Sequence, residues 1–378
     1  MFRTFLIQII FALALIINYW ADSEEPGNLK MKLSDTSSNF VNGLPEGVTL
    51  NGYLDGYYNY NNDFNSALSK FSLLSPYRDE FRVNIAMLKL AYASDIVRGT
   101  LTVQYGDIPG VGWPSNMQYL QEANIGFRPF KNFWVDMGYF LTHIGAEGVK
   151  PKDNFFSTYS LCAFNEPTYQ SGIRLSYNLE KLTVQLHLLN GYNVLADNNK
   201  NKSVGITLDY NPFSNIELVY NNIIGNEMPV SSGIYIPKTR FYNNFIVKLF
   251  PSKRTDVLLC FDFCSQEKSK LKDPGSAALM YSGFVAFRYR LGKKISAMLR
   301  AETFNDPDAI LSNAFTDGNG DLTGLKANGI SFGVEYDPMQ RLYIRLESRF
   351  LETSKGQNIF NNNRNSRLES VFSTGIEF

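Results

Sequence analysis

Hydrophobic and polar residues alternate along most of the chain from about Val48 onward. The clearest stretch is "RLYIRLESRF", residues 341–350, where leucine, isoleucine and phenylalanine alternate with tyrosine, arginine and glutamate. The same period of two recurs in "SVGITLDY", residues 203–210, and in "NGISFGVEY", residues 328–336. Successive side chains of a strand point to opposite faces, so this period predicts strands with one apolar and one polar face. In "FRVNIAMLKLAY", residues 81–92, the parity changes midway, which predicts a β-bulge.

Short and long connections alternate between these segments. The short ones carry turn-forming Pro, Asn, Asp, Gly and Lys and fall at residues 93–97, 128–132, 178–181, 211–215, 251–255, 291–294 and 337–341. The long ones fall at roughly 61–80, 107–117, 141–169, 191–202, 224–239, 265–278, 305–327 and 351–366. Seven short turns and eight long loops join sixteen strands and place every long loop at one end.

This asymmetry predicts an all-β protein, a transmembrane antiparallel up-and-down β-barrel with short periplasmic turns and long extracellular loops. A bilayer does not tolerate open sheet edges, so the sheet has to close on itself. A soluble sandwich or propeller is the alternative, but it needs neither long loops at one end nor charges on the enclosed face. Fourteen strands is the alternative count, if a weak segment such as 48–60 or 117–128 is not a strand.

The last stretch, "LESVFSTGIEF" at residues 368–378, also alternates, and we expect it to be the closing strand. It would pair with the first strand near residues 48–58 and so remove the last open edge. Phe372, Ile376 and Phe378 would then face lipid, with Phe378 at the periplasmic aromatic girdle. A terminal aromatic on an alternating strand also resembles the C-terminal signal that the outer-membrane assembly machinery reads.

The N-terminus predicts export. Arg3 precedes an apolar run from Phe5 to Ile17, which is too short to span a bilayer and is typical of a secretory signal. We therefore expect a cleaved signal peptide at residues 1–21, a polar linker at 22–46 and the barrel at 47–378; an uncleaved membrane anchor is the alternative. Beyond residue 21 no run reaches the roughly 18 apolar residues of a membrane helix, which excludes a helical transporter.

Composition limits the partners. The chain has 36 basic and 36 acidic residues, a net charge of zero and 14% aromatic residues, which argues against disorder and against a nucleic-acid partner. The partners expected for an outer-membrane barrel are lipid, lipopolysaccharide and small hydrophilic solutes. A homotrimer and a monomer both remain open.

Charged residues on the predicted inner face are the candidate pore lining. They are Arg288, Arg290, Arg300, Glu302, Glu335, Arg345, Glu347 and Arg349 in late strands, and Asp209, Glu217 and Asp262 in earlier ones. A sixteen-stranded barrel leaves a water channel, so an arginine-rich wall facing a carboxylate-rich wall would orient polar solutes and set ion preference. Anion selectivity through Arg288, Arg290 and Arg345 is one hypothesis. The alternative is that these charges pair across strands and stiffen the wall.

The loop at residues 141–169 is the longest and the third of the long loops. General porins fold a long third loop inward, which predicts that Glu147, Lys150, Lys152 and Asp153 line a constriction. A lid resting outside the mouth is the alternative.

Cysteine and histidine give no catalytic or cofactor signal. Cys162, Cys260 and Cys264 are odd in number, and Cys260 and Cys264 lie about 13 Å apart along one strand, too far to pair with each other. We interpret the three as free thiols, neither ligands nor nucleophiles. His143 and His187 have no serine or aspartate at an interpretable spacing, so we expect no enzyme, no cofactor and no resident metal.

A calcium loop is the remaining motif to consider. "FTDGNGDLTG", residues 315–324, places Asp317, Asn319 and Asp321 at loop positions one, three and five. The sixth position is Leu322 instead of glycine, and the twelfth is Asn328 instead of glutamate. The pattern therefore favours a surface loop.

Several segments occur in an order typical of a known family. They are "LDGYYNYNND" at 54–63, "VQYGD" at 103–107, "QEANIGFRP" at 121–129, "WVDMGYFLTHIGAEG" at 134–148, "GIRLSYN" at 172–178, "LLNGYNVLADNNKNKSVGITLDYNP" at 188–212 and "LRAETFNDPDAI" at 299–310. Together they resemble the OmpL-like β-barrel porin family of Bacteroidota-type outer membranes. The resemblance implies a porin-like barrel with no catalytic motif. We therefore expect a channel that conducts small hydrophilic solutes passively. The alternative function is a plugged barrel that serves as scaffold for surface lipoproteins or for a secretion or adhesion complex.

Overall fold

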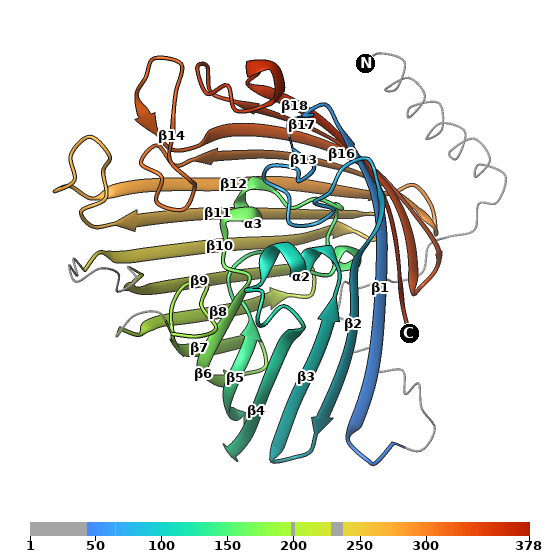
Figure 1. Cartoon of the computed structure of the whole chain (residues 1–378). Helices are drawn as coiled ribbons and strands as arrows, with labels where there is room; N and C mark the ends of the chain where they lie inside the picture. The colour runs from blue at the N-terminus through green and yellow to red at the C-terminus, as the bar shows by residue number, and fades with distance from the viewer. Residues whose placement is uncertain (1–43, 65, 198–200, 228–236) are drawn as a thin grey trace.

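The chain forms a closed antiparallel β-barrel in a computed structural model that describes residues 44–64, 66–197, 201–227 and 237–378 (Figure 1). Sixteen strands of the described residues make up the barrel, and each pairs with its neighbours in sequence. Their bounds are β1 Val48–Asn61, β2 Phe81–Ala93, β3 Val97–Tyr105, β4 Leu120–Phe130, β5 Phe133–Leu141, β6 Tyr169–Asn178, β7 Leu182–Leu189, β8 Ser203–Phe213, β9 Ile216–Asn226, β10 Thr239–Ser252, β11 Thr255–Gln266, β12 Ala278–Arg290, β13 Ile295–Asn305, β16 Lys326–Met339, β17 Leu342–Thr353 and β18 Ser366–Glu377. The predicted fold and strand count are confirmed.

The barrel closes where the last strand meets the first. β18 pairs with β1 from Glu377 opposite Tyr53 to Glu369 opposite Asn61, and Phe378 exchanges backbone hydrogen bonds with Gly52. The predicted bulge is also present: Asp55 pairs with Ile85 and Gly56 with Val83, so Asn84 has no partner in the ladder. The expected signal peptide at 1–21 and all but the end of the linker at 22–46 lie outside the described residues.

Alternation along each strand puts apolar side chains outside and polar ones inside. In β11, Phe261 is 47% exposed, whereas its neighbours Cys260 and Asp262 are buried. Large apolar side chains are exposed in the same way on nearly every strand, Phe372, Ile376 and Phe378 among them. An outer surface of this kind suits contact with lipid, because exposing so much apolar area to water is unfavourable. Among the described residues no helix has the length and apolar character to cross a membrane.

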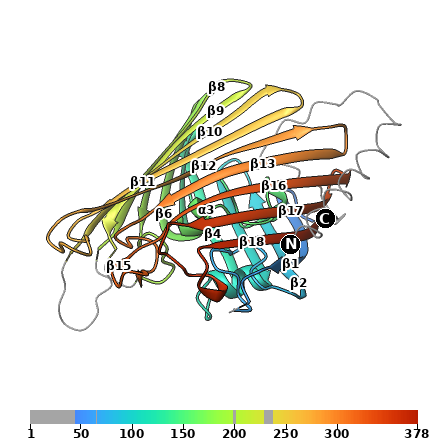
Figure 2. The same cartoon turned by 90° about the horizontal axis from the view of Figure 1, so that it is seen from above.

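The long connections lie at one end of the barrel, and three of them pack inside it. These are loop L1, residues 62–80; loop L2, residues 106–119, which holds α2 Asp107–Gly112; and loop L3, residues 142–168, which holds η1 Pro151–Asp153 and α3 Leu161–Asn165. Figure 2 shows α3 enclosed by the ring of strands. Their apolar side chains, such as Leu74, Ile108, Phe156 and Leu161, are fully buried in clusters against the inner wall.

The remaining elements belong to outer loops. β14 Phe315–Thr316 and β15 Leu322–Thr323 form a small hairpin, and η2 Asn361–Asn363 precedes β18. The hairpin carries the calcium-like stretch, and the carboxylate of Asp317 accepts hydrogen bonds from the backbone N–H groups of Asn319 and Asp321. These hydrogen bonds within the turn explain why an aspartate stands at position 317, at the tip of this hairpin.

Candidate functional site

Loop L3 runs through the lumen from one end of the barrel nearly to the other. It leaves β5 at the long-loop end and reaches Glu377, at the short-turn end, where both Lys150 and Lys152 pair with that carboxylate. The backbone N–H of Lys152 also donates to the hydroxyl of Tyr53 on β1, at 3.2 Å. The chain then returns through α3 to β6. Of the two positions considered from the sequence, L3 thus folds inward and is not a lid outside the mouth.

A buried charge network of Arg300, Glu302, Glu347 and Arg349 holds the middle of L3 against β13 and β17. Arg300 donates to the carboxylate of Glu147 and to the carbonyl of Thr158, both at 2.9 Å. Glu347 accepts from the backbone N–H groups of Ser157 and Thr158, at 2.7 and 3.0 Å.

Arg349 completes the network from β17. Arg349 donates in a bidentate manner to Glu302, which also accepts the N–H of Leu161. The side chains of Arg300, Glu302 and Arg349 are fully buried, so every charge relies on these partners rather than on water.

The rest of the predicted arginine wall is also covered. Arg345 pairs with Glu335, its direct neighbour across β16 and β17, and donates to the L3 carbonyls of Pro151 and Asn154 at 3.0 and 2.8 Å. Arg288 lies over the ring of Phe155 in L3, and Arg290 pairs with Asp256. This differs from the expectation that these arginines line a wide water channel: L3 takes the place of the water along this wall.

Water-accessible charge remains on the opposite side of the lumen. A cavity of about 260 Å³ lies between the first residues of L3 and the wall formed by β5 to β10. Arg174, Asp209, Glu217 and Lys248 line it and are all half-buried. Lys248 pairs with Glu217 at 2.7 Å, whereas no lysine or arginine among the described residues lies within 4.0 Å of the Asp209 carboxylate.

Two histidines bound this cavity. The rings of His143, in L3, and His187, on β7, stack at 3.9 Å between centroids. Nε2 of His143 donates to the carbonyl of Asn222 on β9 at 3.0 Å, and Nδ1 lies 2.8 Å from the side-chain amide of Gln170 on β6. Burial lowers the pKa of His143 below its ordinary value, so the ring stays neutral in this position. His143 therefore ties the start of L3 to three strands of the nearby wall, β6, β7 and β9.

The candidate residues thus divide into separate groups. Asp209 and Glu217 line the cavity, and seven of the eight late-strand charges lie under or beside L3, whereas Arg290 pairs with Asp256 on β11. Glu147 is buried against Arg300, and Lys150 and Lys152 reach β18. Asp153 remains half exposed beside Lys150. Asp262 belongs to neither group, because it is buried on β11 against α3. The stacking of His143 on His187 was not predicted, because the two residues are 44 positions apart and nothing in the sequence around either one indicates the contact.

Comparison with known proteins agrees with this architecture. The family model described as "Putative beta-barrel porin-2, OmpL-like" matches residues 47–378. A search of curated proteins gave no match.

Several solved outer-membrane proteins share the fold at low sequence identity. The outer membrane channel DcaP of Acinetobacter baumannii superposes with a TM-score of 0.58 at 14% identity, covering 88% of this chain and 97% of its own. OmpT of Vibrio cholerae gives 0.57 at 11%, covering 88% and 97%. An anion-selective porin from Comamonas acidovorans gives 0.54 at 11%, covering 88% and 99%.

Proposed function

The chain belongs to the OmpL-like porin family whose model spans its whole barrel, and on this premise we propose that small hydrophilic solutes cross it through the cavity between L3 and β5 to β10. The protein is a porin-like channel of the outer membrane. The family and the similar folds imply a channel that is not an enzyme. Export by a cleaved signal peptide belongs to the proposal.

One observation favours a solute path along β5 to β10. The inner wall under L3 is buried and its charges are paired, whereas the wall of β5 to β10 presents half-buried charges of both signs to a cavity. Polar solutes and ions need such groups to replace part of their hydration shell. L3 would act as the constriction, with Glu147, Lys150, Lys152 and Asp153 fixing its position rather than contacting the solute.

Conductance of the purified full chain in planar bilayers is the direct test. Discrete channel openings are expected. A correctly folded sample without channels would support the scaffold function, which the family and the similar structures do not favour. One similar structure is described as a trimer form of OmpT, and native mass spectrometry would decide between trimer and monomer for this chain.

Removing the cavity carboxylates should change ion selectivity. Asp209→Asn is expected to lower the cation-to-anion permeability ratio by up to about tenfold, since one charge some 6 Å from an ion in water contributes about 0.7 kcal/mol, with opposite sign for a cation and for an anion. Glu217→Gln should act in the same direction and more weakly, because Lys248 already pairs with Glu217. The measurement is the reversal potential in a salt gradient.

Asp95→Asn is the matched control for this experiment. It makes the same chemical change on a periplasmic turn, where the side chain is fully exposed. An equal shift in the Asp95 and Asp209 variants would contradict a path along β8 and β9.

Acid should loosen the start of L3. Buried His143 remains neutral while L3 is seated. Once L3 is displaced, the His143 ring takes up a proton when the pH is below its ordinary pKa of about 6.5. The displaced state therefore binds more protons, and each pH unit below 6.5 favours it by up to about 1.4 kcal/mol. The positive charge of Arg174 opposes protonation of His143 in place, while the His187 ring stacks on His143 and Asp209 and Glu217 line the same cavity.

We expect single-channel conductance to rise as the pH falls from 7 to 5 and this rise to shrink in His143→Gln. His187→Gln serves as the comparison, because it keeps the titrating group on L3 and removes only the ring stacked on it. A pH profile of His143→Gln identical to that of the unaltered chain would contradict this role.

A further inference from the structure

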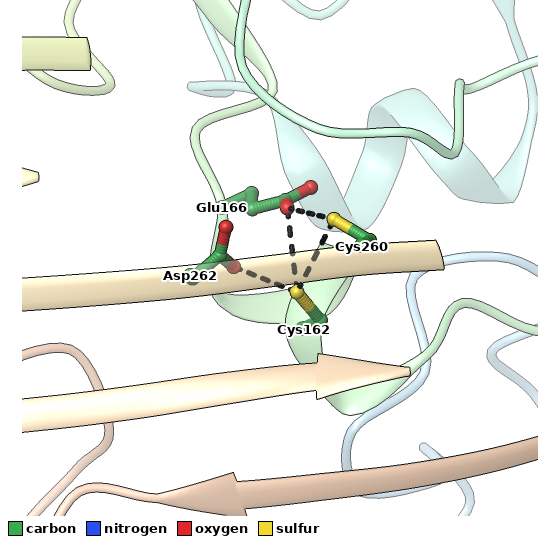
Figure 3. A group of neighbouring side chains, drawn as sticks. All are labelled: Cys162, Glu166, Cys260 and Asp262. Carbon is green, nitrogen blue, oxygen red and sulfur yellow. Dashed lines mark hydrogen bonds between the residues drawn. The ribbon is translucent and has the colours of Figure 1, made fainter. Parts of the chain in front are cut away.

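Four side chains from L3 and β11 converge in the lumen, apart from the solute path. Cys162 lies in α3 and Glu166 follows it, while Cys260 and Asp262 lie two residues apart on the inner face of β11 (Figure 3). All four are buried, and one ligand atom from each lies within 4.8 Å of the others. Gly145 leaves room for them, because a Cβ there would come within 2.0 Å of the Glu166 carboxylate.

The distances suit a tetrahedral metal ion. The two sulfur atoms are 3.8 Å apart, and Oε1 of Glu166 lies 3.5 Å from Cys162 Sγ and 3.8 Å from Cys260 Sγ. Zinc takes sulfur at about 2.3 Å and carboxylate oxygen at about 2.0–2.2 Å, so its tetrahedral donors stand about 3.3–3.8 Å apart. The Cys162 thiol, which donates to Asp262 at 2.6 Å, sits closer than this, and loss of its proton would remove that hydrogen bond.

The carboxyl groups of Glu166 and Asp262 also lack a positively charged partner. Among the described residues, no lysine, arginine or histidine lies within salt-bridge distance of Glu166 or Asp262, whereas the other buried carboxylates facing L3, those of Glu302, Glu335 and Glu347, each have an arginine. The carboxyl groups of Glu166 and Asp262 face each other, and their other partners are neutral: the thiols and the side chains of Asn244 and Ser282. Buried anionic groups without a positive charge are strongly unfavourable, and a divalent cation would supply that charge.

A separate observation points to a further group at this place. The hydroxyl of Tyr242, fully buried on β10, faces Asp262 but makes no hydrogen bond of normal geometry. In addition, Asn244 donates to Asp262 at 2.7 Å and to Cys260 Sγ at 3.2 Å, and Ser282 donates to Asp262 at 3.1 Å. Such outer hydrogen bonds orient ligands in protein metal sites.

We propose that Cys162, Glu166, Cys260 and Asp262 bind one divalent metal ion of the zinc type, which clamps L3 to β11. Two thiolates with two carboxylates match the ligands of zinc better than those of magnesium or calcium, which prefer oxygen alone. Binding releases the protons of both thiols. The three cysteines form no disulfide, as expected from the sequence, but under this proposal Cys162 and Cys260 are metal ligands. The proposal stands whether or not the solute path lies along β5 to β10.

Metal content of the full chain, purified without chelator, tests the proposal. We expect about one equivalent of zinc per chain in the unaltered protein and in Cys264→Ser, and little in Cys162→Ser or Cys260→Ser. Cys264→Ser is the matched control, because Cys264 is a buried thiol on the same face of β11, outside the cluster. Replacement of zinc by cobalt should give thiolate-to-cobalt absorption in the same two metal-binding proteins only.

Two results would overturn the proposal. The first is an unaltered chain that, after reduction, binds neither zinc nor cobalt. The second is a Cys162–Cys260 disulfide, seen as a mass lower by two hydrogens and as a linked peptide. If the serine variants fail to fold, the cobalt spectra of the unaltered chain and of Cys264→Ser still decide, because the two thiolates can then come only from Cys162 and Cys260.

Discussion

Deleting residues 148–158 is expected to roughly double single-channel conductance or raise it further, because a sixteen-stranded barrel without an inward loop encloses an aqueous channel. The deletion removes the part of L3 that reaches the short-turn end, including η1 and the rings of Phe155 and Phe156. Bilayer conductance and the size limit for sugars in liposome swelling measure the effect.

The barrel itself should survive this deletion. Arg345 keeps Glu335, and Arg349 keeps Glu302, so the principal ion pairs of the wall remain. The sixteen residues of L3 that are left easily span β5 and β6, which are neighbouring strands.

A loop of the outer end supplies the matched control. Residues 270–275 are mostly exposed, and the backbones of Ser269 and Ser276, which flank them, are already hydrogen-bonded at 2.9 Å. Their deletion should leave conductance unchanged. If the folded L3 deletion also conducts like the unaltered protein, L3 is not the constriction.

The sequence predicts the barrel well because its signals are local. A period of two, as in residues 341–350, follows from strand geometry, and turns such as the one at residues 178–181, which begins with Asn178, follow from the backbone preferences of turn-forming residues. The bulge at Asn84 was predictable for the same reason, since it breaks the parity of one strand. Because each strand pairs antiparallel with the next strand along the chain, the order of all the strands around the barrel follows.

The interior was harder to predict because its contacts join distant residues. Parity places Arg300 and Glu347 on the inner face, but it does not reveal that the loop between β5 and β6 covers them. Likewise, Cys162 and Cys260 are 98 positions apart, and only the fold of α3 against β11 brings their sulfur atoms together. Such contacts depend on how a long loop packs, and a single sequence carries no periodic signal for that.

Replacing Arg300 by Gln is expected to release the middle of L3 and to destabilise its seated position by about 3–5 kcal/mol, the usual effect of removing one partner from a buried charge network. Without the guanidinium, Glu147 and Glu347 lose their nearest positive group while both remain buried. Hydrating these carboxylates requires L3 to move. Trypsin cleavage after Lys152, together with thermal unfolding in detergent, would report the change.

Two further variants separate the charge effect from general damage. Arg254→Gln makes the same substitution on an exposed turn and should alter stability by less than about 0.5 kcal/mol. Arg300→Gln combined with Glu147→Gln should recover part of the loss, because it removes one of the buried carboxylates left without a partner.

The outcome also decides between the two interpretations of the inner charges. If Arg300→Gln exposes Lys152 to trypsin and raises conductance, the buried network acts mainly on L3 and thereby on the width of the pore. If the variant unfolds at lower temperature while L3 stays protected, apolar contacts such as those of Phe156 hold the loop. The arginines would then serve mainly to join the strands of the wall, as Arg345 and Glu335 already do across β16 and β17.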